Sequence, residues 1–356
     1  GLSADLFNTA YRWLGHLRGG LASATIAACA GFAALSGSSL ASAVTMGRVA
    51  LPQMKKHKYE DGLATGSVAA GGTLGFLIPP SGGMIIYAIL TEQSIGRLFM
   101  AGIIPGILLT LLFIGAIYLV VARRPESGPP GEKSTLKERM VSLRLALPIV
   151  AVVIITIGGM YTGFFTPVEA SAVGAFLTFV VALARRSLSW AKMRTVVLDT
   201  MSATATVFLI IIGAFVFIPF MSLTELPAQI VTILTSLPVG SLGILLIIIL
   251  IYMFLGMFLE GIAMLVLTIP VVIPIAMGMG WDLVWFGIIV VVVLEMGMIS
   301  PPVGINVFVV KSIAPDVPMG TIFRGIWPFW FAMAFLLVLL VAFPQIALFL
   351  PQALVG

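Results

Sequence analysis

Apolar segments separated by short polar connections follow one another along the whole chain. An α-helix rises 1.5 Å per residue, so about 20 apolar residues are needed to cross a bilayer core of about 30 Å. Uninterrupted segments of roughly this length predict transmembrane helices at residues 97–122, 145–162, 166–184, 200–222 and 325–348. The pattern therefore predicts an all-α, polytopic membrane protein.

Two further apolar segments are interrupted near their centres. Residues 20–54 contain the run Ser36-Gly37-Ser38-Ser39, and residues 241–279 contain Glu260-Gly261. Each half of the first segment has about 15 residues, which as a helix reach roughly 22 Å and fall short of a bilayer core. Both segments are therefore predicted to be re-entrant helical hairpins with their tips at the interruptions.

Each predicted hairpin is followed by an apolar segment that a proline pair breaks. Residues 62–90 contain Pro79-Pro80, and residues 283–311 contain Pro301-Pro302, 222 positions later (301 − 79 = 222). The surrounding stretches, G-F-L-I-P-P-S-G-G and G-M-I-S-P-P-V-G-I, resemble each other. A duplicated apolar unit with a Pro/Gly break in each copy is typical of the binding site of a secondary transporter.

The basic residues test this topology, because Lys and Arg are enriched in cytoplasmic loops. When Lys55, Lys56 and Lys58 are placed in the cytoplasm, only Arg97 of the 19 Lys and Arg residues falls outside, and Arg48 falls within a hairpin. Five predicted crossings, an odd number, then separate the two hairpins. The second unit therefore enters from the opposite face, and the repeat is predicted to be inverted.

Polar segments outside these helices have simpler interpretations. Residues 1–19 are amphipathic and predict an interfacial helix. Residues 123–144 carry much of the charge and predict a solvent-exposed linker, and residues 223–240, with two prolines, predict a surface connection.

Composition excludes several other classes of protein. Hydrophobic residues make up 60% of the chain and charged residues 9%, and the mean hydropathy of +1.17 excludes a soluble globular domain. The single Cys29 excludes a disulfide framework, and His16 and His57 are not spaced as metal ligands. The net charge of +5 indicates no nucleic-acid interface, since the basic residues flank apolar segments instead of clustering with aromatic ones.

The chain carries no signature of an enzyme. The motifs H-E-x-x-H and G-x-S-x-G are absent, and a nucleophile at Ser36 or Ser38 would lack an activating base. The ATP-binding motif G-x-x-x-x-G-K-[ST] is absent as well. We therefore expect a transporter without an organic cofactor, and an intramembrane enzyme is a remote alternative.

The proline breaks are predicted to expose ligands for a cation. Because proline has no N–H, each pair frees the backbone carbonyls four residues upstream. Freed carbonyls, helix C-termini and the hydroxyls of a hairpin tip supply the oxygen atoms that Na⁺ prefers. The predicted sodium-binding residues are Ser36, Gly37, Ser38, Ser39, Gly75, Phe76, Pro79, Glu260, Gly261, Gly297, Met298 and Pro301.

The half-helix after each break is predicted to hold an anionic substrate. Its first N–H groups and its positive dipole end favour negative charge. Glycine at these positions permits close approach of the backbone, and asparagine can both donate and accept hydrogen bonds. The predicted substrate-binding residues are Ser38, Pro80, Ser81, Gly82, Pro302, Gly304 and Asn306.

Charged residues inside the apolar segments have alternative roles. Glu260 and Glu295 are each expected to bind a cation or a proton, and Glu260 alternatively to face water at a hairpin tip. Glu169 follows a proline at a predicted helix start, which favours a structural role. Arg48 is expected either to extend to the cytoplasmic face or to bind a substrate carboxylate.

Five motifs together resemble the large membrane subunit (DctM-like, M subunit) of TRAP transporters. They are L-R-G-G-L-A (17–22), S-G-S-S-L-A-S-A (36–43), L-I-P-P-S (77–81), G-F-F-T-P-V-E-A-S-A-V-G-A (163–175) and I-S-P-P-V-G-I-N-V-F-V (299–309). The resemblance covers essentially the whole chain in the same order. Relative to the family, about two helices are expected to precede residue 1.

The resemblance implies a fold like that of the ion-transporter superfamily and an elevator mechanism. The transport domain would comprise residues 20–92 and 241–311, and the scaffold would comprise residues 93–240 and 312–356. It also implies a place in the bacterial inner membrane and sodium-driven import of an organic acid, such as a C4-dicarboxylate, sialic acid or a keto acid.

The partners implied by the resemblance are a small four-helix membrane subunit of the Q type and a periplasmic substrate-binding protein of the P type. A stand-alone sodium/anion symporter of the same superfamily is the alternative function. Dependence of transport on an added binding protein separates the two.

Overall fold

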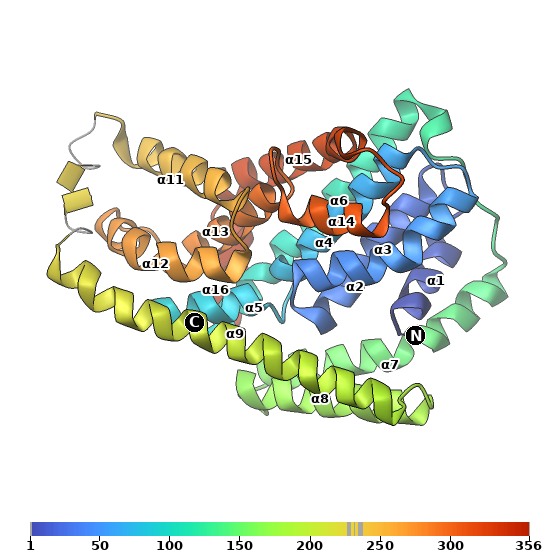
Figure 1. The fold of residues 1–356 in the computed structure, drawn as a ribbon, viewed down its shortest axis with the longest axis horizontal. Coiled ribbons are helices and arrows are strands. Elements are labelled where there is room, and N and C mark those ends of the chain that lie inside the picture. The colour runs from blue at the N-terminus through green and yellow to red at the C-terminus, as the bar shows by residue number, and fades with distance from the viewer. Residues whose placement is uncertain (1, 226–228, 231, 234–237, 356) are drawn as a thin grey trace.

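The structure is a computed structural model that describes residues 2–225, 229–230, 232–233 and 238–355. Every regular element in these residues is a helix (Figure 1). Seven helical segments of this described part are long and apolar enough to cross a membrane, namely Asp61–Thr91, Ile95–Arg123, Leu136–Tyr161, Pro167–Ala184, Trp190–Phe217, Gly261–Gly278 and Met319–Ala342. The prediction of an all-α, polytopic membrane protein is confirmed.

The first predicted hairpin consists of α2 (Gly20–Ser36) and α3 (Ser39–Lys56). Gly37 ends α2 with a left-handed φ of 58°, and its N–H donates to the Ala33 carbonyl. Glycine adopts this conformation without the penalty that a Cβ would bring. Ser38 then caps α3, because its hydroxyl accepts a hydrogen bond from Ala41 N at 3.4 Å. The predicted interruption is therefore a tight turn between two short helices.

The first proline pair separates α4 (Asp61–Leu77) from α5 (Gly82–Thr91). The second pair separates α13 (Leu283–Met298) from α14 (Ile305–Ile313). Both Pro-Pro peptide bonds are cis. Both predicted helix breaks are thus present in the structure.

The central helices are α6 (Ile95–Arg123), α7 (Leu136–Tyr161), α8 (Pro167–Ala184) and α9 (Trp190–Leu223). The linker predicted at 123–144 is wrong in its second part, because α7 begins at Leu136. Thr135 and Glu138 form a capping box there, with Thr135 N donating to the Glu138 carboxylate at 2.8 Å. The charges that suggested a loop lie on an exposed helix turn that this box initiates. A second capping box, Thr166 with Glu169, begins α8 and confirms the structural role of Glu169.

The second hairpin consists of α11 (Gly240–Gly256) and α12 (Gly261–Gly278). Its predicted tip at Glu260-Gly261 is correct, since Glu260 caps α12. Most of the predicted connection at 223–240 lies outside the described residues.

The last predicted span, 325–348, is wrong in its limits. The structure has α15 (Met319–Ala342) and then α16 (Gln345–Val355). Pro344 lies between the two helices, and the residue before a proline avoids the helical conformation.

The N-terminal helix α1 (Leu2–Leu14) packs on α2 and α7. Thr9 Oγ1 lies 2.9 Å from the Ser142 carbonyl in α7, and Asp5 forms an ion pair with Arg185 at the end of α8. These contacts join α1 to the α7–α8 pair. The interfacial position of α1 remains a prediction.

The core is centred on α4 and α13. Every residue of α4 from Gly62 to Leu77, and every residue of α13 from Val284 to Met298, is buried. The two parts of the chain interlock around them, because α5 packs on α12 and α14 packs on α3. In contrast, α8 and α9 are apolar and largely exposed. A helix that is apolar all round and unburied requires lipid or another protein around it.

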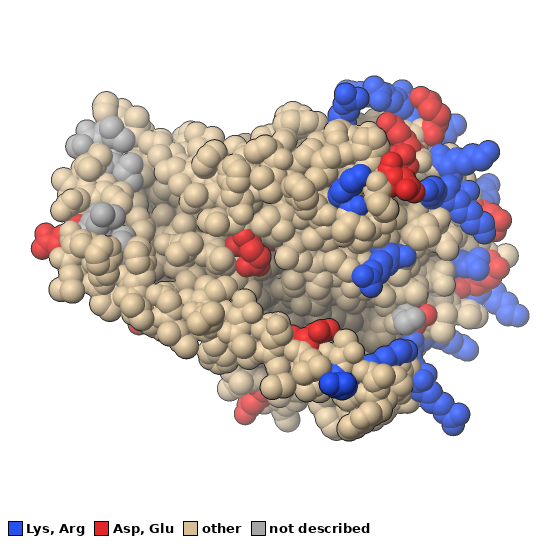
Figure 2. Space-filling model, viewed as in Figure 1, with Lys and Arg blue, Asp and Glu red and all other residues tan. Residues whose placement is uncertain are grey.

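Charge is distributed asymmetrically over the molecule. Figure 2 shows Lys and Arg gathered at one end, the end where Figure 1 places α1, and the rest of the visible surface almost free of basic residues. This distribution is what the positive-inside rule requires of a membrane protein.

Candidate functional site

The first hairpin tip lies directly against the first helix break. Gly82 N, at the start of α5, donates to the Gly37 carbonyl at 3.0 Å. A Cβ atom added to Gly75 would lie 2.5 Å from the Ser38 carbonyl oxygen, so the two backbones touch without an intervening side chain. The structure thus brings together predicted residues from segments about 40 positions apart.

The hydroxyl groups of this region are already engaged with one another. Ser36 Oγ lies 2.7 Å from Ser42 Oγ, and Ser42 was not among the predicted residues. Ser81 Oγ donates to the Phe76 carbonyl, which the proline pair leaves without a backbone donor. One lone pair of that carbonyl is therefore occupied, and the Gly75 carbonyl is the other upstream candidate for direct contact with a cation.

The second tip and the second break repeat these contacts. Gly304 N, before α14, donates to the Met257 carbonyl at 3.1 Å, as Gly82 N does to Gly37. A Cβ atom added to Gly297 would lie 2.7 Å from Gly256 Cα, as one at Gly75 would meet Ser38. The positions correspond at the spacing of the proline pairs, since 304 − 82 = 222 and 297 − 75 = 222.

The two halves meet through the second tip. A Cβ atom added to Gly261 would lie 3.0 Å from Cζ of Phe76, at the first break. The half-buried Glu260 beside it accepts hydrogen bonds from Ile262 N at 2.9 Å and Ala263 N at 3.2 Å, both to Oε2. Glu260 therefore caps α12 with one carboxylate oxygen, and the second oxygen is available to a cation.

Glu295 is a buried carboxylate between the two halves. Its residue is 1% exposed, and neither carboxylate oxygen has a hydrogen-bond partner among the described residues. The Ser39 hydroxyl of the first tip and the Glu260 carboxylate of the second tip both interact electrostatically with the Glu295 carboxylate. A carboxylate buried in this way requires a cation or a proton. Glu295 was not in the predicted set of sodium-binding residues, although the sequence led us to expect it to bind a cation or a proton.

Asn306 is fully buried in the first turn of α14, and neither its amide nitrogen nor its amide oxygen has a described partner. Buried amides are usually hydrogen-bonded, so this side chain is available to a ligand. Pro301 and Pro302 are exposed in the turn before it.

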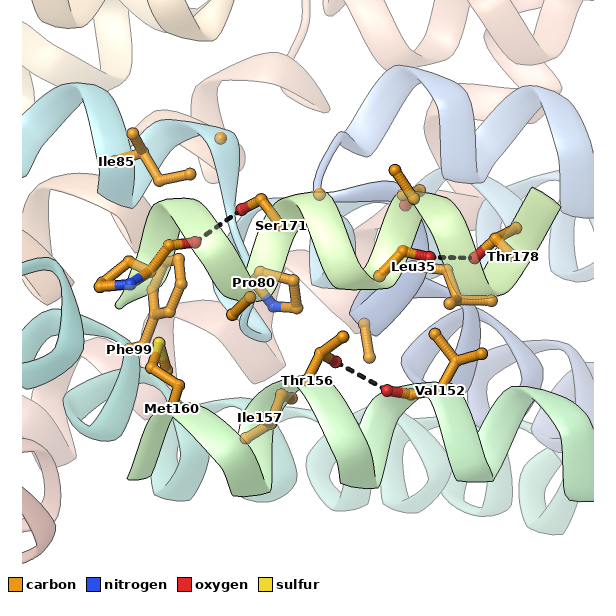
Figure 3. A pocket seen from close by; sticks show the side chains of 18 residues that line it. Leu35, Pro80, Ile85, Phe99, Val152, Thr156, Ile157, Met160, Ser171 and Thr178 are labelled. Atoms are coloured by element: carbon orange, nitrogen blue, oxygen red, sulfur yellow. Dashed lines mark hydrogen bonds between the residues drawn. The ribbon is translucent and has the colours of Figure 1, made fainter. Parts of the chain in front are cut away.

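A cavity of about 460 Å³ opens beside the first tip. Ser36, Gly37, Pro80 and Gly82 line one wall, and α7 and α8 form the other (Figure 3). Its volume suits a small organic molecule. The predicted substrate residues of the second break, Pro302, Gly304 and Asn306, do not line this cavity.

Sequence reasoning missed the wall formed by α7 and α8. Thr156, Ser171 and Thr178 contribute hydroxyls there, each donating to the carbonyl four residues upstream at 2.8–2.9 Å (Figure 3). These hydroxyls leave lone pairs toward the cavity and have no proton free for an anion. The spacing of Ser171, Gly174 and Thr178 along one helix face was the available signal.

The model of the DctM component of tripartite ATP-independent periplasmic (TRAP) transporters matches residues 1–346. The chain belongs to this family. It is therefore a membrane permease subunit of a TRAP transporter, not an enzyme.

Curated relatives of this TRAP permease span nearly the whole chain. The C4-dicarboxylate TRAP transporter large permease protein of Pseudomonas aeruginosa is 36% identical over 99% of this chain and 82% of its own length. The sialic acid TRAP transporter large permease protein of Vibrio cholerae is 33% identical over 100% of this chain and 83% of its own. An isethionate TRAP transporter permease protein of Oleidesulfovibrio alaskensis is 36% identical over 88% of this chain and 49% of its own. The names of these three relatives give three different substrates, so membership of the family does not identify the substrate of this chain.

The site of this TRAP permease thus combines two kinds of binding group. Oxygen atoms without partners or with spare lone pairs, at Gly75, Glu260 and Glu295, can coordinate a cation. At the start of α5, Gly82 N and Met84 N already donate to the Gly37 carbonyl and to Ser81 Oγ, so the N-termini of α5 and α14 attract an anion chiefly through the positive ends of their dipoles. Simultaneous binding of a cation and an anion is the chemistry that this arrangement supports.

Proposed function

We propose that this permease couples the inward movement of Na⁺ to the import of an organic anion across the bacterial inner membrane. The observation that carries the proposal is the paired docking of each hairpin tip on a helix break, through Gly82 with Gly37 and Gly304 with Met257. Broken helices whose carbonyls and N-termini face one region can bind a cation and an anion together. Each bound ion lowers the electrostatic cost of the other, which is the basis of coupling.

The proposal includes an inverted repeat. The break-side residues of these contacts lie 222 positions apart (304 − 82 = 222), and their tip-side partners lie 220 apart (257 − 37 = 220). In the part of the chain that the structure describes, five helical crossings separate the two hairpins. An odd number of crossings gives the two units opposite orientations in the membrane. The gathering of basic residues at one end of the molecule supports this topology (Figure 2).

Sodium is proposed as the coupling ion, with no organic cofactor. The candidate ligands at the first tip are the Gly75 carbonyl and the hydroxyls of Ser36 and Ser39, and those at the second are Glu260 and Glu295. Neutral carbonyl and hydroxyl oxygens with few charges suit a monovalent hard cation. Gly297 and Met298, at the C-terminus of α13, stay candidates, although the Gly297 carbonyl already accepts a hydrogen bond from Ser300 N at 2.8 Å.

The substrate is proposed to be an organic anion that enters the cavity beside Pro80 and Gly82. The relatives named for C4-dicarboxylate, sialic acid and isethionate support an organic anion, and the N-terminus of α5 supports negative charge at this position. The lone pairs of Thr156 and Ser171 on the opposite wall would face the substrate's hydroxyl groups.

An elevator movement is proposed for the part of the molecule that holds the two tips. The expectation from the sequence placed α6 and α15 in the scaffold, within residues 93–240 and 312–356. We propose instead that both helices belong to the moving part, because they pack on the hairpins and broken helices. The backbones of α4 and α15 are in direct contact, because a Cβ on Gly325 would collide with the Gly62 carbonyl oxygen and one on Gly66 would collide with the Gly325 carbonyl oxygen. This close packing of α4 on α15 supports a proposal in which α15 moves with α4, whereas α7, α8 and α9 form the static part.

The proposed partners are a small Q-type membrane subunit and a periplasmic P-type binding protein. The isethionate relative is named DctMQ, which joins M and Q and supports a membrane partner for this chain. The exposed apolar faces of α8 and α9 offer it a surface. A stand-alone symporter remains the alternative function.

The test is uptake of labelled organic acids into proteoliposomes that contain the permease and its small membrane partner, under an imposed sodium gradient. We expect uptake only when both sodium and the binding protein are present. Uptake with sodium alone would favour the stand-alone symporter, and uptake that ignores the sodium gradient would contradict the proposed coupling.

A further inference from the structure

A second hollow lies apart from the transport site, between α4, α6 and α15. It has a volume of about 820 Å³ and shares no lining residue with the cavity beside Pro80. Its lining residues are Glu60, Gly62, Leu63, Ala116, Leu119, Val120, Arg123, Arg124, Thr321, Arg324, Gly325, Trp327, Pro328 and Phe331. We call it the arginine groove.

One end of the arginine groove is strongly basic. Arg123 and Arg124 lie at the end of α6, Arg324 lies in the second turn of α15, and Glu60 is the acid among the lining residues. These four charges sum to +2 (3 − 1 = +2). None of the three arginines forms an ion pair with a described residue, whereas Arg12, Lys55 and Arg185 each do. Unpaired guanidinium groups that converge on one hollow favour a phosphate.

The other end is apolar on both walls. Ala116 and Val120 share the face of α6 that carries Arg123, and Pro328 and Phe331 share the face of α15 that carries Arg324. The two helices run in opposite directions, so seven residues on each wall lead about 10 Å from the arginines into the hydrocarbon region. Leu119 and Phe331 are 60% and 62% exposed along this path.

We propose that the arginine groove binds an anionic phospholipid of the cytoplasmic leaflet. Its phosphate contacts the three arginines, and its acyl chains lie along Leu119 and Phe331. Basic pockets between transmembrane helices on the cytoplasmic side have this preference, and Trp327 lies where indole rings meet the head-group region. A free anion would use the basic end and leave the apolar walls uncovered, so the lipid accounts for both ends of the groove.

The test is native mass spectrometry of the complete, delipidated transporter titrated with phosphatidylglycerol and with phosphatidylethanolamine of the same acyl chains. We expect tighter binding of phosphatidylglycerol. Each basic side chain at a membrane surface strengthens binding of an anionic lipid about fivefold. The double variant Arg123→Gln/Arg324→Gln should therefore weaken phosphatidylglycerol binding by about thirtyfold. It should weaken phosphatidylethanolamine binding less, because the ammonium group of that lipid compensates the charge of its phosphate.

The control Arg144→Gln/Arg194→Gln removes the same charge from exposed arginines outside the groove. It should bind phosphatidylglycerol as the wild type does. The variant Arg123→Lys/Arg324→Lys keeps the charge and should retain the preference for phosphatidylglycerol, which would show that substitution at these two positions leaves the fold intact. Equal effects of the Gln pair and the control pair would overturn the proposal. So would equal binding of the two lipids by the wild type. Displacement of the lipid by millimolar inorganic phosphate would assign the groove to a free anion instead.

Discussion

Replacement of Gly75 by alanine should push the first hairpin tip away from the first helix break. The added Cβ would lie 2.5 Å from the Ser38 carbonyl oxygen and 2.6 Å from Ser42 Oγ, whereas ordinary contact begins at 3.4 Å. The tip must therefore retreat by about 0.9 Å (3.4 − 2.5 = 0.9). The first obstacle is a backbone atom, which cannot rotate aside, and α4 is buried along its whole length.

The expected cost follows from the size of this collision. Overpacking of a dense core costs about 1–3 kcal/mol, which corresponds to a shift of about 5- to 150-fold in the population of the docked tip. A retreat of this size along the hydrogen bond from Gly82 N to the Gly37 carbonyl, now 3.0 Å, would also take it out of bonding range. We expect the rate of sodium-driven uptake to decrease by a factor within this range, about 5- to 150-fold.

The assay compares initial rates of uptake in proteoliposomes for three matched variants. Gly82→Ala places its Cβ 3.2 Å from the Gly37 carbonyl oxygen, a deficit of only 0.2 Å (3.4 − 3.2 = 0.2), and should be mildly affected. Gly115→Ala, in the middle of α6, meets nothing within 4 Å and should stabilise its helix slightly. Uptake by Gly75→Ala equal to that of Gly115→Ala would refute the docking of tip on break as the basis of transport.

Three further changes test separate parts of the site. Glu295→Gln keeps the volume of the side chain but removes its charge, so the sodium concentration for half-maximal uptake should rise by roughly tenfold, as expected for the loss of a charged ligand; an unchanged sodium dependence would exclude Glu295 from coupling. Replacing Pro79-Pro80 by Ala-Ala restores backbone donors and permits a continuous helix, so uptake should cease while membrane insertion stays intact; normal sodium-coupled uptake would contradict the site. Thr166→Ala removes the hydroxyl that accepts from Glu169 N at 3.3 Å and should lower stability by about 1 kcal/mol in thermal unfolding without a change in uptake; lost uptake at full stability would give this cap a functional role.

Local chemistry made the helix breaks predictable. Pro79-Pro80 and Pro301-Pro302 remove backbone donors wherever they occur, and the Ser/Gly run at 36–39 is a turn signal that depends on its own residues. The start of α7 was equally local, since Thr135 and Glu138 form a T-x-x-E capping box, but we did not use this motif and assigned the charged segment to a linker.

The contents of the site were only partly predictable. Ten of the predicted residues belong to the first tip and break, and the structure brings the two segments together through Gly37 with Gly82 and Ser38 with Gly75. Ser42 and Thr156 were missed because their roles depend on which helices face them. Ser171 was missed although its spacing from Gly174 and Thr178 marks one helix face.

The sequence by itself determined where the chain is apolar, where its helices must break and on which side its charges lie, because each of these depends on residues within a turn or two of one another. The tertiary structure alone decided that Glu295 is buried without a partner near both tips, that α7 and α8 close the cavity beside Pro80, and that three arginines from α6 and α15 meet in one groove. These features depend on which helices pack together, and that choice is made by the fit of buried surfaces from distant parts of the chain.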